Sequence, residues 1–209
     1  TSYYNVFVDG KLHKVVKVCG TDTLIHLVSG IDKRIHSLKI QKRSEGEFGK
    51  TTVHQFVLSG SGRLAEEPAV RTRHIEFIGN SLTCGYGTDG KHRDEPFLVE
   101  TENCNLTFAS MVARYYDADY TLIAHSGRGA ARNYGDSVRV SKVTMKDRML
   151  NTFDEDLTHK WNFKEYRPDL VVINLGSNDF STEPHPYKSE FTKAYKQILA
   201  QLREHYGDI

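Results

Sequence analysis

The stretch HIEFIGNSLTCGYG, residues 74–87, is where an apolar segment runs into a polar, glycine-rich turn. Its first part, IEFI at 75–78, predicts a β-strand. Two later segments have the same form, YTLIA at 120–124 and DLVVINL at 169–175. The last of these is rich in β-branched residues, as in a strand covered on both faces. The sequence after residue 74 therefore contains single strands separated by long intervals.

The intervals between these strands can hold helices. Apolar residues recur near the 3.6-residue period over 105–116 and again over 187–205, which predicts a helix in each range. Strands that alternate with helices indicate a parallel α/β layer. We therefore expect an α/β fold for this part of the chain.

Each predicted strand is followed by a loop of polar residues and glycine. The loops are GNSLTCGYG at 79–87, HSGRG at 125–129 and GSNDF at 176–180. In a parallel α/β sheet the ligand crevice lies outside the carboxyl ends of the strands. We expect the three loops to meet at one edge of the sheet and to carry the chemistry.

The residues of these loops include most parts of an acyl-transfer site. Ser81 can expose its hydroxyl as a nucleophile, while the backbone N–H groups of Ser81 and Gly127 and the amide of Asn178 can point at one oxyanion. The missing Cβ of Gly127 lets a substrate carbonyl approach the backbone. Each residue alone also has an ordinary interpretation, as a helix cap, a closed turn or an Asx turn. Their occurrence after three separate strands favours catalysis.

These motifs resemble those of a known family. GNSL at 79–82, Gly127 and GSND at 176–179 are similar to the first three sequence blocks of the SGNH, or GDSL-like, hydrolases, with Asn80 in place of the Asp of the name. The resemblance implies a flavodoxin-like α/β/α hydrolase domain. It also implies that Ser81 is the nucleophile and that Gly127 and Asn178 form the oxyanion hole.

Longer stretches narrow the resemblance. Residues 74–87, 100–103 and 168–180 are similar to the second family of carbohydrate esterases, which are acetyl esterases acting on plant polysaccharides. This similarity implies a serine esterase that removes O-acetyl groups from xylan- or mannan-type polysaccharides or oligosaccharides through an acetyl-serine intermediate. An acetylated saccharide is then the expected partner, and no cofactor or metal is required.

The first 70 residues show β patterns. Strand-like runs at 4–8 and 11–18 flank Asp9-Gly10, which is the signal of a type I′ hairpin. Further β-rich runs follow at 23–28, 35–41 and 52–58, separated by glycine-containing turns, and predict a β-sandwich. In the carbohydrate esterase family a small jelly-roll sandwich precedes the hydrolase domain, and residues 39–45 resemble one of its strands. We expect domains at 1–70 and 71–209, with a boundary over 64–72 around Pro68.

The catalytic base is the part that this sequence does not show. The resemblance implies a histidine in an Asp-x-x-His or Trp-His-Pro context, well after the asparagine block. His159 has the Asp-x-x-His spacing but precedes that block, and His185 follows Asn178 too closely. His125, next to Gly127, is the remaining stand-in. We therefore expect a C-terminally incomplete hydrolase domain that, on its own, hydrolyses an ester barely faster than buffer does.

Composition excludes several other classes of protein. The chain has 28 Lys and Arg against 27 Asp and Glu, a net charge of +1, so it carries no basic excess for a nucleic acid. No apolar run approaches the roughly 18 to 20 residues of a membrane helix, and we expect no membrane partner. Cys19, Cys84 and Cys104 lack C-x-x-C spacing, and the scattered histidines show no metal motif. Localisation stays open between cytoplasmic and secreted, and the oligomeric state is unknown.

Other residues and functions remain as alternatives. Arg128, Arg132, Asn133 and Tyr134 follow the glycine loop and could line a sugar subsite, whereas Asp179 is expected to orient the asparagine loop. The alternative functions are a general GDSL-type lipase or thioesterase and a noncatalytic carbohydrate-binding protein. Nucleotide binding is disfavoured because residues 79–87 contain no Gly-Lys-Ser/Thr.

Overall fold

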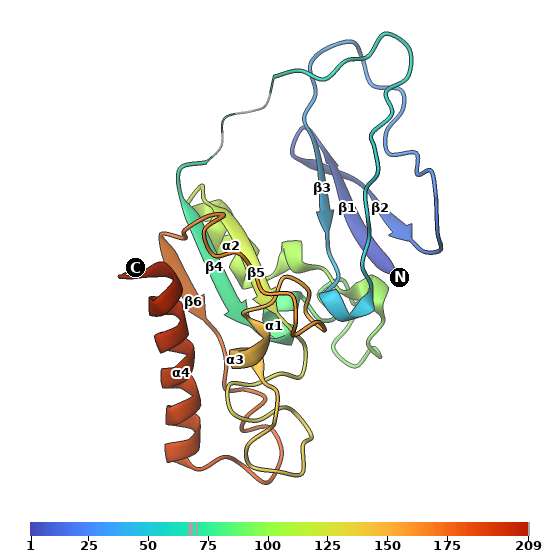
Figure 1. The fold of residues 1–209 in the computed structure, drawn as a ribbon. Coiled ribbons are helices and arrows are strands. Elements are labelled where there is room, and N and C mark those ends of the chain that lie inside the picture. The colour runs from blue at the N-terminus through green and yellow to red at the C-terminus, as the bar shows by residue number, and fades with distance from the viewer. Residues whose placement is uncertain (67–68, 70, 209) are drawn as a thin grey trace.

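The computed structural model of the 209-residue chain describes residues 1–66, 69 and 71–208. The chain forms an antiparallel sheet near its N-terminus and a parallel sheet flanked by helices further on (Figure 1). We call residues 1–66 the N-terminal part and residues 71–208 the α/β part. A boundary near Pro68 stays a prediction, since that residue lies outside the described ones.

The sheet of the α/β part has three parallel strands. They are β4 (His74–Gly79), β5 (Asp119–Ala124) and β6 (Leu170–Ile173), and their order is β5-β4-β6. The first strand of this part in the chain is therefore central, and the second and third strands flank it, which is the 2-1-3 order that begins a flavodoxin-like fold. The expected parallel α/β architecture is confirmed.

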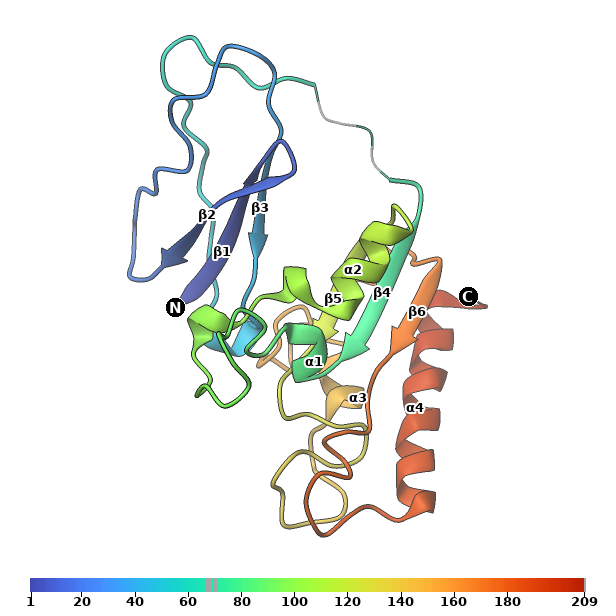
Figure 2. The same cartoon turned by 180° about the vertical axis from the view of Figure 1, so that it is seen from behind.

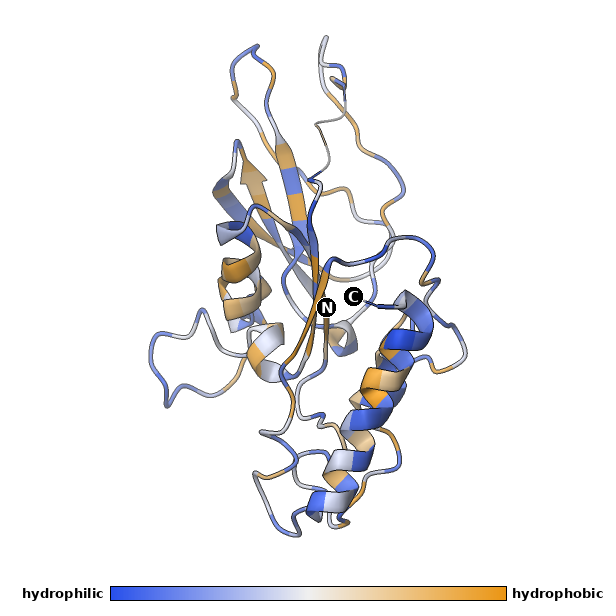
Figure 3. Cartoon of the chain, turned by 90° about the vertical axis from the view of Figure 1, so that its left-hand side faces the viewer, coloured by the Kyte–Doolittle hydropathy of each residue, from blue (hydrophilic) through white to orange (hydrophobic). Residues whose placement is uncertain are grey.

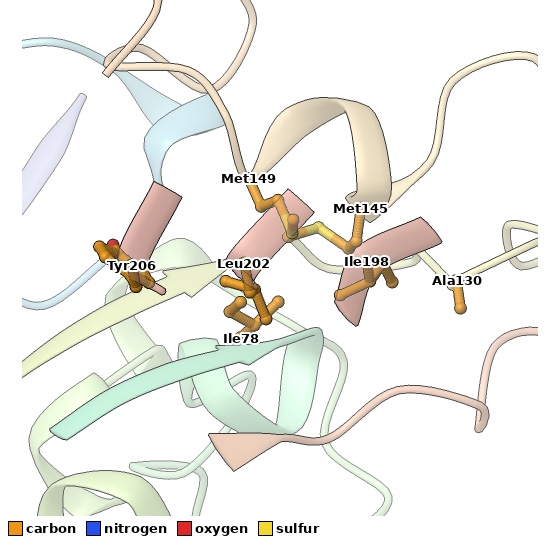
Figure 4. Packing of buried hydrophobic residues seen from close by; sticks show 7 residues of the cluster. All are labelled: Ile78, Ala130, Met145, Met149, Ile198, Leu202 and Tyr206. Carbon is orange, nitrogen blue, oxygen red and sulfur yellow. The ribbon is translucent and has the colours of Figure 1, made fainter. Parts of the chain in front are cut away.

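Helices cover both faces of this sheet. Successive side chains of a strand point to opposite faces, and Ile75 and Phe77 of β4 pack with Ala109 and Ala113 of α2 (Phe108–Tyr115). Ile78 points the other way, into a second cluster (Figure 4). That cluster consists of Ile78, Ala130, Met145, Met149, Ile198, Leu202 and Tyr206, drawn from β4, α3 (Met145–Arg148), α4 (Lys188–Tyr206) and a loop.

The helix α4 is amphipathic, as its sequence period predicts. Ala194, Ile198, Leu202 and Tyr206 are buried at intervals of four residues, and hydrophilic positions occupy much of the rest of the helix (Figure 3). Tyr206 also donates a hydrogen bond of 2.8 Å to the buried Glu76. The described part of the chain has no helix with the length and apolarity needed to cross a membrane.

The helix predicted at 105–116 is divided in two. A 3-10 turn spans Cys104–Leu106, and α2 begins after Thr107. The Thr107 hydroxyl accepts a hydrogen bond of 3.4 Å from the backbone N–H of Ser110. Threonine at an N-cap satisfies a backbone donor that a continuous helix would satisfy internally, and it therefore places the start of α2 at residue 108.

The N-terminal sheet has β1 (Ser2–Val8) in the centre, with β2 (Lys11–Val18) and β3 (Leu38–Lys42) on either side. Both neighbours are antiparallel to β1. The predicted Asp-Gly hairpin is confirmed, because Asp9 has φ +50° and Gly10 has φ +75°, the pair of positive values that a type I′ turn requires.

Two runs expected to be strands are not strands. Residues 23–28 and 52–58 follow an irregular path in the described chain, and β3 covers 38–42 rather than 35–41. A strand exists only where a neighbour satisfies its backbone groups, and these two runs have no such neighbour among the described residues. Their apolar side chains stay exposed as a result: Leu24 at 89%, Val57 at 67% and Phe56 at 60%. The second sheet of the expected sandwich is therefore not formed by the described residues.

The N-terminal part lies beside the α/β part (Figures 1 and 2), and buried and partly buried polar side chains join the two. The Asn5 amide donates 2.9 Å to Asn103, and the Gln41 amide donates 2.8 Å to the Tyr120 hydroxyl. Arg43, only 2% exposed, donates 2.7 Å to the carbonyl of Glu102. Polar groups that pair across this contact fix the orientation of the two parts, because separation leaves them without these partners until water replaces them.

Candidate active site

Ser81 lies at the point where β4 turns into a short helix, α1 (Ser81–Cys84). The side chain of Asn80 caps this helix by accepting a hydrogen bond of 3.2 Å from the backbone N–H of Leu82. A Cβ at Gly79 would overlap the Thr83 side chain, so glycine is required for the helix to pack this closely against the strand. Ser81 itself is partly exposed. The local sequence thus presents a serine at the carboxyl edge of the central strand.

The three predicted loops are in contact. The Asn80 amide donates 2.9 Å to the Ser177 hydroxyl, which joins the loop after β4 to the loop after β6. The Asn178 amide donates 2.7 Å to the carbonyl of Arg128, which joins the loop after β6 to the loop after β5. The structure therefore brings the loops of Ser81, Gly127 and Asn178 together at one edge of the sheet.

Gly127 needs its lack of a side chain for conformational reasons. Its φ is +76°, in the left-handed region that other residues rarely adopt, and a Cβ there would meet no atom within 4 Å. The carbonyl of Gly127 accepts a hydrogen bond of 2.8 Å from the N–H of Tyr134. The turn is held by its backbone, and the side on which a Cβ would project is open.

The Asn178 side chain is 9% exposed and has a fixed orientation. A carboxamide nitrogen carries two hydrogens, and the bond to the Arg128 carbonyl uses one of them. The second hydrogen can serve a negatively charged oxygen. A donor that is already oriented by a protein contact costs no reorganisation when charge develops nearby, which is what an oxyanion hole requires.

Asp179 holds a neighbouring loop. Its carboxylate is fully buried and accepts hydrogen bonds from three consecutive backbone N–H groups, those of Ala130 at 3.0 Å, Ala131 at 2.7 Å and Arg132 at 2.8 Å. A Cβ at Gly129 would overlap both Arg132 and Asp179, so this turn can close only around glycine. Asp179 thus orders residues 130–132 beyond the glycine loop, rather than the asparagine loop alone.

His125 is not placed to act as a base toward Ser81. It is 1% exposed, its Nδ1 pairs with Asp154, and its Nε2 lies 3.2 Å from the Glu47 carboxylate. Both ring nitrogens therefore have partners, so His125 is not the stand-in base that the sequence left as a candidate. His159 pairs with Asp156 at 2.5 Å and His185 with Glu183 at 3.4 Å. Within the described ranges, no histidine forms a hydrogen bond with the Ser81 hydroxyl.

Two of the residues considered for a sugar subsite serve the protein itself. The buried Arg132 guanidinium donates to the carbonyls of Val138 and Glu183 and to the Thr182 hydroxyl. The Asn133 amide donates 3.0 Å to the carbonyl of Val143. Tyr134 is different, since it is 62% exposed.

Sequence reasoning missed two acidic residues of the N-terminal part. Glu45 accepts a hydrogen bond of 2.7 Å from the backbone N–H of Ser126, and Glu47 faces His125. In the sequence, Ser44-Glu45-Gly46-Glu47 looks like an exposed turn between two strands. No local pattern shows that it reaches a loop 81 residues further along the chain.

The fold and these loops define a class of proteins, and comparison with known families gives the same one. Residues 77–209 match the model of the GDSL-like Lipase/Acylhydrolase family, so the chain belongs to this family. Residues 1–68 match the model of the carbohydrate esterase 2 N-terminal domain. The N-terminal part is thus the domain that the carbohydrate esterase resemblance implies, although its described residues form a single sheet.

Characterised relatives share both parts of the chain. The cellulase/esterase CelE of Acetivibrio thermocellus is 36% identical over 207 residues, which is 99% of this chain and 25% of that protein. An acetylxylan esterase / glucomannan deacetylase of Cellvibrio japonicus is 33% identical over 182 residues, 86% of this chain and 49% of that protein. The chain therefore spans half or less of the length of these relatives.

A solved structure shares the fold closely. It is a family two carbohydrate esterase from Clostridium thermocellum in complex with cellohexaose, with a TM-score of 0.92 and 36% identity. The similarity covers 99% of this chain and 62% of that one. The arrangement of the N-terminal part on the α/β part is thus shared with an esterase structure that holds a saccharide.

Proposed function

We propose that this chain carries the nucleophile and oxyanion hole of an esterase that removes O-acetyl groups from xylan- or mannan-type polysaccharides or oligosaccharides. The observation that supports the proposal most is the contact of the three loops through the Asn80–Ser177 and Asn178–Arg128 hydrogen bonds. Relatives named acetylxylan esterase and glucomannan deacetylase support the substrate class.

In the proposed reaction the Ser81 hydroxyl attacks the acetyl carbonyl and a tetrahedral oxyanion forms. The N–H groups of Ser81 and Gly127 and the free hydrogen of the Asn178 amide stabilise this charge. The sugar hydroxyl leaves with a proton, and water then hydrolyses the acetyl-serine to release acetate. A histidine C-terminal to the asparagine block, as the family resemblance implies, accepts the proton of Ser81 in this scheme.

The test uses the longest natural polypeptide that contains these residues. We expect it to release acetate from acetylated xylan and from 4-nitrophenyl acetate, and we expect Ser81→Ala to lose this activity almost completely because no nucleophile remains. Ser189→Ala, at an exposed position of α4, is the matched control and should retain full activity. Full activity of Ser81→Ala would contradict the assignment of the nucleophile.

Two further measurements separate the alternative functions. A site built for acetate should lose activity as the acyl chain grows from acetyl to octanoyl, whereas a general lipase or thioesterase should gain it. Binding of acetylated xylan by Ser81→Ala, together with no acetate release by the wild type, would favour a noncatalytic carbohydrate-binding protein. Without a general base beside Ser81, hydrolysis of 4-nitrophenyl acetate should be about 10²- to 10⁴-fold slower than with one, which a comparison of residues 1–209 with a longer natural polypeptide can measure.

A further inference from the structure

A carboxyl group of the N-terminal part reaches the loop that carries Gly127. We propose that Glu45 is a positioning residue of the esterase site, which holds the backbone of residues 125–127 so that the N–H of Gly127 points at the oxyanion. The inference rests on the proposed function, since it assigns a task to the N-terminal part within the same reaction.

The contact itself is short and partly buried. One oxygen of Glu45 accepts a hydrogen bond of 2.7 Å from the backbone N–H of Ser126, the residue directly before Gly127. Glu45 is 7% exposed, and its side chain comes from the segment between β3 and the 3-10 turn Gly46–Phe48. A distance of 2.7 Å is at the short end of the range for N–H···O hydrogen bonds. The His125–Ser126 peptide group, one residue before Gly127, is therefore held from outside the α/β part.

The residue on the other side of Ser126 is fixed as well. The His125 ring lies between Glu47 of the N-terminal part and Asp154 of the α/β part. Arg148 lies 3.4 Å from Asp154 and anchors it. Burial alone would raise the pKa of Asp154, but the hydrogen bond to His125 and the nearby Arg148 hold that pKa below its usual value. The two glutamates thus hold residues 125 and 126 at two separate atoms.

Glu45 is held in place by its own neighbours. Its backbone N–H donates 3.1 Å to Glu102, and the buried Cys84 thiol lies 3.5 Å from the oxygen that accepts from Ser126. Burial, and after it the proximity of Glu45, raises the pKa of Glu102 to about 8. Glu102 is therefore mostly protonated at pH 7, which relieves the repulsion that two buried carboxylates would otherwise feel.

Loss of this contact should affect the transition state more than substrate binding. Without Glu45, the Ser126 N–H loses its acceptor among the described residues, and the loop is no longer held in one position. An oxyanion donor works only about 2.7–3.1 Å from the developing charge, and a misplacement of about 1 Å can cost about 10²-fold in rate. The neutral carbonyl oxygen of the bound ester forms a weaker hydrogen bond with the same donor. The affinity of the enzyme for the ester should therefore change little.

The experiment compares three variants of the longest natural polypeptide that contains this chain. We expect Glu45→Ala to lower kcat on 4-nitrophenyl acetate by about 10- to 100-fold, with KM changed by no more than about threefold. Glu45→Gln should keep most of kcat, because the amide oxygen can still accept from Ser126. Gln41→Ala removes the hydrogen bond to Tyr120, which joins the same two parts away from the loop, and should leave kcat unchanged.

Each outcome decides one question. Wild-type kcat in Glu45→Ala, equal losses in Glu45→Ala and Glu45→Gln, or an equal loss in Gln41→Ala would overturn the positioning assignment. If circular dichroism shows that Glu45→Ala does not fold, Glu45→Asp replaces it in the test. This variant keeps a carboxyl group but withdraws the acceptor by one methylene, so it should show an intermediate loss of kcat. Wild-type kcat in Glu45→Asp would also overturn the positioning assignment. An inactive wild type would instead reject the proposed function and not this contact.

Discussion

Two buried carboxyl groups hold the polypeptide between residues 125 and 132, and they do so differently. Asp179 belongs to the α/β part and accepts three backbone N–H groups. Glu45 comes from the N-terminal part and accepts one, with the buried carboxyl of Glu102 beside it. One oxygen of Glu45 and one of Glu102 are buried without a hydrogen-bond partner among the described residues.

This difference shows how much a buried charge depends on its donors. Three N–H groups replace the water that the Asp179 carboxyl group would otherwise bind, so this group can be completely buried. The Glu45–Glu102 pair has fewer donors and depends on a proton to coexist. Residues 130–132 are therefore held from within the α/β part, whereas the segment that precedes Gly127 depends on the docking of the N-terminal part.

Removal of Asp179 should have the largest effect on stability. Asp179→Ala leaves three buried N–H groups without an acceptor, at about 1–3 kcal/mol each, so the free energy of unfolding should fall by about 3 to 9 kcal/mol. Asp179→Asn keeps one oxygen and should lose less. Denaturant unfolding measures both variants. Equal stability of Asp179→Ala and wild type would show that these bonds do not hold the loop.

The next largest effect should be the pH dependence of stability, which tests the Glu45–Glu102 pair. The folded state raises the pKa of Glu102 to about 8 from a usual value of 4.5, so ionisation of this group opposes folding. The penalty is absent below about pH 4.5, grows as pH rises, and is complete above about pH 8. At 1.36 kcal/mol per pKa unit, unfolding free energy should fall by about 3 kcal/mol between pH 5 and pH 8.

Glu102→Gln provides the matched control for this prediction, since it keeps the shape and removes the titration. The variant should lose that part of the pH dependence, while Lys42, whose pKa is lowered by burial, keeps its own contribution. Parallel stability curves for wild type and Glu102→Gln between pH 5 and pH 8 would show that Glu102 does not titrate in this range.

The smallest of these effects compares two glycines of the same loop. Gly129→Ala places a Cβ against backbone that Asp179 holds in place, and overpacking of this kind costs about 1–3 kcal/mol. Gly127→Ala meets no atom and bears only the cost of its positive φ, about 1 kcal/mol. Thermal unfolding distinguishes the two variants. A larger loss for Gly127→Ala would mean that the half of the loop before residue 128 is the more tightly held.

Local patterns in the sequence were enough for much of the fold. The Asp9-Gly10 hairpin, the strand at 75–78 and the helix at 187–205 each follow from a period or a turn signal within a few residues. The runs at 23–28 and 52–58 have the composition of strands, but a strand also needs a partner, which composition does not report.

The candidate site, like the fold, could be predicted from the sequence only in part. The loops after the strands could be predicted because a parallel sheet places all its carboxyl ends at one edge. The reach of Glu45 to Ser126 could not, because it depends on how two folded parts dock. The contacts of His125 with two carboxylates could not be predicted either, since these groups come from the distant positions 47 and 154.

The neutral cap of α1 has an electrostatic consequence for catalysis. Asn80 satisfies the Leu82 N–H with its oxygen and reaches Ser177 with its nitrogen, so the residue beside the nucleophile adds no full charge. A carboxylate at this position would place a negative potential a few bonds from where an alkoxide-like oxygen must form. With a neutral carboxamide at position 80, the electrostatic potential near Ser81 is set mainly by the dipoles of the N–H groups. These dipoles stabilise a negatively charged oxygen.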